Sequence, residues 1–202
     1  MAERQPAEGI ANSPVTERRD ARLQVSRRLD WRFMLPDLAL DRVLYFGSSR
    51  GLLPEALEMF SRSLTTADPG ASAIDGAAFT VVVARNPSKQ TLRRAVGALG
   101  AGGALYIELD GRFPARRHWR ALGLHAIRAE VAHLGLKDIS LAWHWPDFDS
   151  CTRVVPLGGD AARAGALSAG VRGAAMRALA RALAFPRLVA RLPVSLSLVA
   201  RR

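Results

Sequence analysis

The 202-residue sequence is 49% hydrophobic and has a formal net charge of +11, which is enough apolar material for one sizeable core. The charge is uneven, because residues 159–202 hold eight Arg and one Asp and therefore +7 of the +11. This distribution predicts a local basic patch and argues against a specific nucleic-acid surface on the folded middle. Cys151 is the single cysteine, which excludes an internal disulfide and favours a reducing compartment.

Two further features of the sequence concern location. No uninterrupted apolar stretch reaches the roughly 18 residues that a transmembrane helix needs. Residues 1–28 are polar and charged and lack the apolar run of a signal peptide. We therefore expect a cytoplasmic protein.

The N-terminal part divides into two segments. Residues 1–20 are rich in Pro, Gly, Asn and Ser with few large apolar side chains, a composition that predicts disorder. Residues 21–35 are expected to form a helical approach segment with Leu23, Leu29 and Phe33 as its anchors.

The centre of the chain alternates strand-like and helix-like segments. Strands are predicted over residues 42–46, 64–67, 79–84, 104–109, 139–145 and 194–200, and helices over residues 52–60, 90–99 and 116–134. The run FTVVVA at residues 79–84 is continuously apolar, which is typical of a parallel strand covered on both faces. This alternation predicts βαβ units and a mainly parallel sheet within one domain, residues 21–202, rather than an Ala-rich helical bundle.

A basic helical insertion is expected at about residues 159–192, before the last strand. Within residues 173–185, one helical face carries Met176, Leu179 and Leu183, and the other carries Arg177 and Arg181. Two interpretations remain open. The helix packs on its own domain with a solvated Arg face, or residues 172–191 make a weak contact with an anionic membrane or an acidic protein.

The first predicted strand, turn and helix form a candidate ligand site. In an open α/β sheet, ligands bind beyond the carboxyl ends of the strands. The turn from Gly47 to Gly51 lets a ligand approach the backbone, and the amides at the start of the following helix favour a negative group. Asp68 ends the next strand twenty-one residues after Gly47, and its carboxylate can accept hydrogen bonds from both hydroxyls of a ribose. This arrangement predicts a site for an adenosine-containing ligand.

The same stretch resembles class I S-adenosylmethionine-dependent methyltransferases. Their first motif is roughly V-L-D-x-G-x-G-x-G, where this chain has VLYFGSSRG at residues 43–51. Asp68 falls where that family keeps its ribose-binding acid, FTVVV at residues 79–83 matches the F-D-x-V-x strand, and LGAGGAL at residues 99–105 is similar to L-x-P-G-G-x-L. The resemblance covers roughly residues 40–145 and the last strand.

This resemblance implies S-adenosylmethionine as the cofactor. It also implies a Rossmann-like, mostly parallel, seven-stranded sheet with helices on both faces and an antiparallel last strand. The residues it assigns to cofactor binding are Tyr45, Gly47, Ser48, Ser49, Gly51, Asp68 and Ala84. Tyr45 stands where the family has an acid and Ser49 where it has a glycine. Because Phe79 follows Asp68 by only eleven residues, the sheet is expected to be shortened around the third strand.

Each binding candidate also has a structural interpretation. Gly47 and Gly51 could serve only a tight turn, and Asp68 could be a turn residue before a proline. Asp75 is either a substitute for the adenine-side acid or a loop residue. Asn86, which precedes Pro87, is similar to the start of the N-P-P-Y motif of amino-group methyltransferases, but Asn-Pro is also a common turn start.

Four residues are candidate catalytic bases. Glu108 and Asp110 end the strand ALYIEL and its following turn, and His118 and His144 lie in aromatic-rich stretches. The stretch WHWPDF at residues 143–148 offers indole faces for sugar or ring stacking, or it packs in the core. The other two histidines lack the partner pattern of a metal site, so no metal is predicted.

These features predict a methyltransferase-like protein acting on a small-molecule or carbohydrate-type acceptor. The alternative is a binding or scaffolding subunit that has the methyltransferase fold but no catalysis. A nicotinamide-dinucleotide enzyme is disfavoured because G-x-G-x-x-G is absent, with Ser49 and Leu52 where its second and third glycines would fall.

Overall fold

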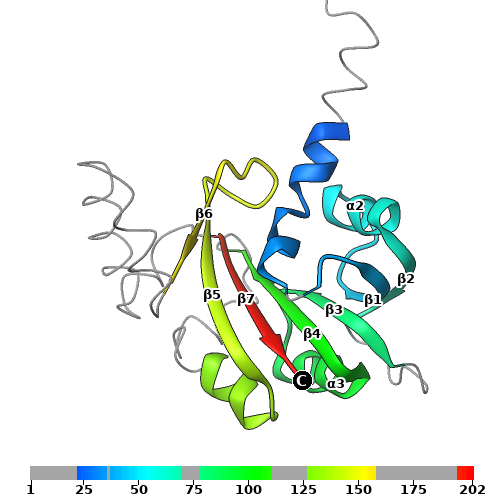
Figure 1. The fold of residues 1–202 in the computed structure, drawn as a ribbon, viewed down its shortest axis with the longest axis vertical. Coiled ribbons are helices and arrows are strands. Elements are labelled where there is room, and N and C mark those ends of the chain that lie inside the picture. Colours follow the sequence, from blue (N-terminus) through cyan, green and yellow to red (C-terminus); the bar gives the residue numbers. More distant parts are fainter. Residues whose placement is uncertain (1–21, 36, 70–77, 111–126, 158–194) are drawn as a thin grey trace, which may run out of the picture.

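The computed structural model describes residues 22–35, 37–69, 78–110, 127–157 and 195–202. They form one seven-stranded sheet in the order β2-β1-β3-β4-β7-β5-β6 (Figure 1). The strands are β1 (Leu40–Phe46), β2 (Ser61–Ala67), β3 (Phe79–Arg85), β4 (Leu99–Leu109), β5 (Lys137–Trp145), β6 (Arg153–Pro156) and β7 (Ser195–Arg201). Strands β1 to β4 pair in parallel, whereas β7 runs antiparallel to both of its neighbours, β4 and β5. The predicted mostly parallel sheet with an antiparallel last strand is confirmed.

Helices cover both faces of the sheet. On one face, helix α2 (Leu52–Phe60), a helical turn at residues 22–27 and the 3₁₀ helix η1 (Asp30–Met34) pack on the odd-numbered residues of β1 and β3. On the other, helix α3 (Lys89–Ala98) and a helix at residues 127–133 pack on the even-numbered residues. Because successive strand side chains point to opposite faces, the apolar runs of β1 and β3 supply both cores.

The helices begin where local chemistry favours them. The predicted helix at residues 52–60 agrees with α2, which has Pro54 in its first turn. In α3, the Ser88 hydroxyl accepts a hydrogen bond from the Thr91 amide at 3.0 Å, satisfying one of the unpaired first-turn amides. None of the described helices is long and apolar enough to cross a membrane.

The described residues between β2 and β3 hold no further strand, in agreement with the expected shortening of the sheet. Two details differ from expectation. β6 was not predicted. Leu23 and Phe33 are exposed, so their assignment as anchors was wrong, although Leu29 is buried. The chain enters a 3₁₀ helix at Asp30, which rotates the buried face onto Trp31 and Leu35.

Several predicted features lie outside the described residues. They are the disordered segment at residues 1–20, Asp75, His118, most of the helix at residues 116–134, the basic insertion at residues 159–192 and the amphipathic helix within it.

Candidate functional site

The turn after β1 lies beside the end of β2. Phe46 pairs with Ala67, so Gly47 and Asp68 leave neighbouring parallel strands at the same edge of the sheet. The side chains of Ser48, Ser49 and Asp68 are exposed. Gly51 has φ +117 and open space where a Cβ would lie, and a groove of about 560 Å³ between α2 and β2 reaches Ser49 and Gly51. This side of the edge is therefore accessible to a ligand.

The side chain of Tyr45, in the strand that precedes the turn, covers Gly47. A Cβ built at Gly47 would lie 2.3 Å from Tyr45 Oη and 2.4 Å from Tyr45 Cζ, so the glycine lets the phenol ring cross the backbone. Tyr45 is fully buried, and its hydroxyl makes no hydrogen bond of ordinary length to a described residue, although Arg85 is close enough to lower its pKa. Burial, followed by the charge of Glu108, raises the pKa of Tyr45. Tyr45 thus presents a neutral hydroxyl where the family resemblance implies an acid.

Polar side chains continue along the edge after β3 and β4. Arg85 Nη2 donates to Asp110 Oδ2 at 3.4 Å, and its Nε lies 4.0 Å from Glu108 Oε2. The Asn86 amide donates to the Glu108 carbonyl at 2.7 Å, and Asn86 Oδ1 accepts from the Asp110 amide at 2.8 Å. These bonds connect Arg85 and Asn86, at the end of β3, to Glu108 and Asp110, at the end of β4, and we call these four residues the rim.

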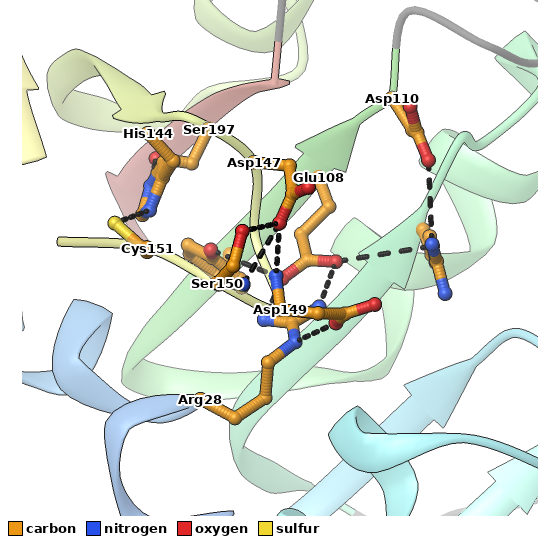
Figure 2. A network of polar contacts seen from close by, with 11 residues as sticks. Arg28, Glu108, Asp110, His144, Asp147, Asp149, Ser150, Cys151 and Ser197 are labelled. Carbon is orange, nitrogen blue, oxygen red and sulfur yellow. Dashed lines mark hydrogen bonds and ion pairs between the residues drawn. The ribbon is translucent and has the colours of Figure 1, made fainter. Parts of the chain in front are cut away.

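Glu108 forms a buried ion pair with Arg28 (Figure 2). Arg28 Nη1 donates to Oε1 at 2.6 Å and Nη2 donates to Oε2 at 2.7 Å, a bidentate pair between residues eighty positions apart. Glu108 is 0% and Arg28 2% exposed. Burial lowers the pKa of Arg28, but the charge and hydrogen bonds of Glu108 outweigh it, so the net shift is upward and the guanidinium remains charged.

Two aromatic residues and a loop carboxylate enclose this pair. Tyr106 Oη donates to Glu108 Oε1 at 3.2 Å, and Trp31 stacks on the Tyr106 ring with centroids 3.8 Å apart. Arg28 Nε donates to Asp149 Oδ1 at 2.8 Å. Burial, followed by Glu108, raises the pKa of Tyr106 well above its usual value. Arg28 and Trp31 of the N-terminal segment therefore cover the carboxyl end of β4.

His144 lies on the same face of the sheet, next to β7. Its Nε2 is 2.8 Å from Ser197 Oγ, and its Nδ1 is 3.6 Å from Cys151 Sγ. Burial, helped by the charge of Arg28, lowers the pKa of His144 to about 4. Burial also raises the pKa of the Cys151 thiol. Near neutral pH this group is a neutral imidazole beside a protonated thiol, which suits hydrogen bonding better than nucleophilic attack.

The predicted site residues fall into separate places. Gly47, Ser48, Ser49, Gly51 and Asp68 gather at the open turn, Glu108 and Asp110 share the rim with Arg85, and His144 lies beyond β7. Ala84 is buried under α3, on the other face of the sheet. Trp143 is buried and Trp145 is 51% exposed. Their functional roles stay predictions.

The sequence analysis missed Arg28, Tyr106 and Asp149. A charged residue between Val25 and Leu29, on the buried side of a helical segment, is the one local signal that marked Arg28. In the described part of the chain, no three His, Cys, Asp or Glu side chains gather as a metal site requires.

No protein-family model matches the sequence, and no curated protein matches it. Among solved structures, the chain is similar to a possible histamine N-methyltransferase from Thermotoga maritima (9% identity, 93% of this chain and 95% of that chain, TM-score 0.45). It is also similar to a SAM-dependent methyltransferase from Archaeoglobus fulgidus (11%, 90% and 94%, TM-score 0.49).

A third similar structure is the phosphoethanolamine N-methyltransferase 2 of Haemonchus contortus in complex with S-adenosyl-L-methionine (12% identity, 87% of this chain, TM-score 0.49). The chain spans about half, 52%, of the length of that protein. At such identities and scores, function has to be argued from this chain's own residues.

Proposed function

We propose that this protein binds S-adenosylmethionine at the carboxyl edge of β1 and β2 and is a methyltransferase-like protein for a small-molecule or carbohydrate-type acceptor. The observation that carries the proposal is the register of β1 and β2, which sets the exposed turn from Gly47 to Gly51 directly beside Asp68. Ligands of open α/β sheets bind at this position.

The residues present fit the nucleoside part of the ligand better than its amino-acid part. The exposed Asp68 carboxylate can accept hydrogen bonds from ribose hydroxyls, and Gly51 leaves open space at the turn. On the amino-acid side, Tyr45 supplies no negative charge for an ammonium group. The absence of one charge-assisted hydrogen bond weakens binding by about 1.5–3 kcal/mol, so we expect low affinity.

When bound, the cofactor would supply a methyl group on a sulfonium. The chain's own residues would hold it so that an acceptor atom lies in line, and positioning would contribute much of the rate. Of the candidate bases, Asp110 is partly exposed, with 16% of its side chain accessible, whereas both oxygens of Glu108 are bound to Arg28. Of these two carboxylates, Asp110 is therefore the better candidate for removing a proton from the acceptor.

Calorimetric titration of the full chain with S-adenosylmethionine and S-adenosylhomocysteine tests the proposal. Saturable heat is expected for the wild type, and Asp68→Asn should weaken binding at least tenfold, the equivalent of about 1.4 kcal/mol. Asp41→Asn is the matched control, because Asp41 is an exposed carboxylate at the opposite end of β1. No heat at millimolar ligand, or equal affinity in the Asp68 and Asp41 variants, would overturn the assignment.

A second candidate is a non-catalytic binding or scaffolding subunit. The observation that favours it is the closed β4 side, where Arg28 binds both Glu108 oxygens and Trp31 covers Tyr106. Incubation with methyl-labelled cofactor and a panel of amines and sugars separates the two. Cofactor binding without label transfer to any acceptor supports the subunit, whereas transfer to one acceptor supports the enzyme.

A further inference from the structure

The Arg28 guanidinium sits in a buried site made by a carboxylate, an aromatic ring and a second carboxylate. Glu108 bonds both terminal nitrogens, Asp149 Oδ1 accepts from Nε at 2.8 Å, and the Phe148 ring centroid lies 5.3 Å from Cζ. We call Glu108, Phe148 and Asp149 the cation cage. A planar cation is thus bound along two edges and one face, which is how proteins recognise guanidinium and ammonium groups.

Stability alone is a weak explanation for this arrangement. Replacing a buried ion pair by packed apolar residues is often neutral or stabilising, because desolvation offsets the attraction. The cage also directs two carboxylates at one cation. It lies at the carboxyl end of β4, on the edge of the sheet where ligands of this fold class bind.

One wall of the cage is exposed to solvent. The Asp149 side chain is 54% exposed, whereas that of Glu108 is 0% exposed. Asp149 belongs to an exposed turn whose amides at Asp149 and Ser150 bond to Asp147 Oδ1 at 3.0 and 2.8 Å. The turn is therefore ordered by its own short-range bonds, and Asp149 is the wall of the cage that a ligand in solution can reach.

A second guanidinium reduces the cost of moving Arg28. Arg85 Nε is buried and lies 4.0 Å from Glu108 Oε2, and the same guanidinium also interacts with the Tyr45 hydroxyl and with Asp110. If Arg28 withdraws, Arg85 can take up part of the Glu108 charge, and Tyr106 continues to donate to Oε1. Figure 2 shows Arg28 on one side of Glu108 and Asp110 on the other.

We propose that the cation cage recognises a guanidinium or primary ammonium group of a ligand and that Arg28 is its internal occupant. A cationic ligand competes with Arg28 for Glu108. That this group anchors the methyl acceptor rests on the proposed function, whereas the cage itself needs no cofactor.

Agmatine is the probe, with uncharged N-butylurea as its control, in calorimetric titrations at constant ionic strength without S-adenosylmethionine. Three proteins are compared: wild type, Arg28→Ala, and the double variant Arg28→Ala/Glu108→Gln. We expect saturable agmatine binding to the wild type, at least tenfold tighter binding to Arg28→Ala, no binding to the double variant, and none of N-butylurea to any of them.

Wild type without saturable agmatine binding, or a double variant that binds as tightly as Arg28→Ala, would overturn the proposal. If Arg28→Ala fails to fold with an unpaired Glu108, the wild type and the neutral double variant still decide the question. Titrating the same samples with S-adenosylmethionine separates the two proposals. Agmatine binding without cofactor binding leaves the cage standing and removes the proposed function, and the reverse result removes the cage alone.

Discussion

The contact between Gly47 and Tyr45 makes a sharp prediction about why this turn begins with glycine. Replacing Gly47 by Ala puts a Cβ 2.3, 2.4 and 2.9 Å from three atoms of the Tyr45 phenol group. Gly47 is not among the glycines with positive φ, so the backbone itself tolerates alanine. Because Tyr45 is fully buried and cannot swing into solvent, we expect a cost near the upper end of overpacking, about 3 kcal/mol.

The partner substitution determines the origin of that cost. In a Tyr45→Ala background the ring is gone, so Gly47→Ala should add almost nothing, and the coupling between the two changes should be about 3 kcal/mol. Tyr45→Phe keeps the ring atoms and should not rescue Gly47→Ala. By itself it removes a buried hydroxyl that makes no hydrogen bond of ordinary length, so it should change the free energy of unfolding little.

Urea and thermal unfolding followed by circular dichroism measure these effects. For a chain of this size, about 3 kcal/mol lowers the melting temperature by roughly 6–12 °C. Gly97→Ala in α3 is the matched control, since nothing lies within 4 Å of a Cβ there, and it should raise stability by up to about 1 kcal/mol. If Gly47→Ala keeps full stability but loses affinity for S-adenosylmethionine, the glycine serves the ligand and the packing argument is refuted.

Three further predictions concern buried or capping polar groups. The pKa of His144 in the folded state is about 4, below its ordinary 6.5, so the neutral imidazole contributes about 3 kcal/mol to the free energy of unfolding above pH 6.5, and this contribution is lost as the pH falls toward 4. His144→Gln should flatten this part of the profile of stability against pH, and parallel profiles for the wild type and the variant would contradict the prediction. Ser88→Ala should cost about 1 kcal/mol in urea unfolding by leaving the Thr91 amide uncapped, and an unchanged midpoint would count against the cap. Tyr106→Phe should cost about 1–3 kcal/mol because Glu108 loses a buried donor, and a neutral result would show that Arg28 alone satisfies it.

The sequence predicts best those elements whose signals are local. The helix at residues 52–60 agrees with the observed α2 because apolar spacing and an early proline act within two turns. The strand predicted at residues 79–84 falls within β3, and it could be predicted because a continuous apolar run by itself indicates a strand buried on both faces. β6 has only four residues, Arg153–Pro156, and ends in proline at the sheet edge, so neither length nor alternation indicated it.

The candidate site could be predicted only where spacing along the chain determines geometry. Gly47 and Asp68 meet because each follows a parallel strand paired in register. Arg28 and Glu108 meet across eighty residues through tertiary packing, and no periodicity encodes that contact. For the same reason, Glu108 looks from sequence like a solvated strand-end acid, although it is fully buried.

The two halves of the carboxyl edge differ in access, and this difference has a mechanistic consequence. At β1 and β2 the turn and Asp68 are exposed. At β4, Glu108 is buried and both of its oxygens are bound to Arg28. Binding at the exposed turn does not require Arg28 to move, whereas any chemistry at Glu108 requires Arg28 to leave. Cofactor affinity should therefore be equal in wild type and Arg28→Ala, while any reaction that uses Glu108 should depend on Arg28. A cofactor affinity that changed with Arg28 would mean that the two halves form one continuous pocket.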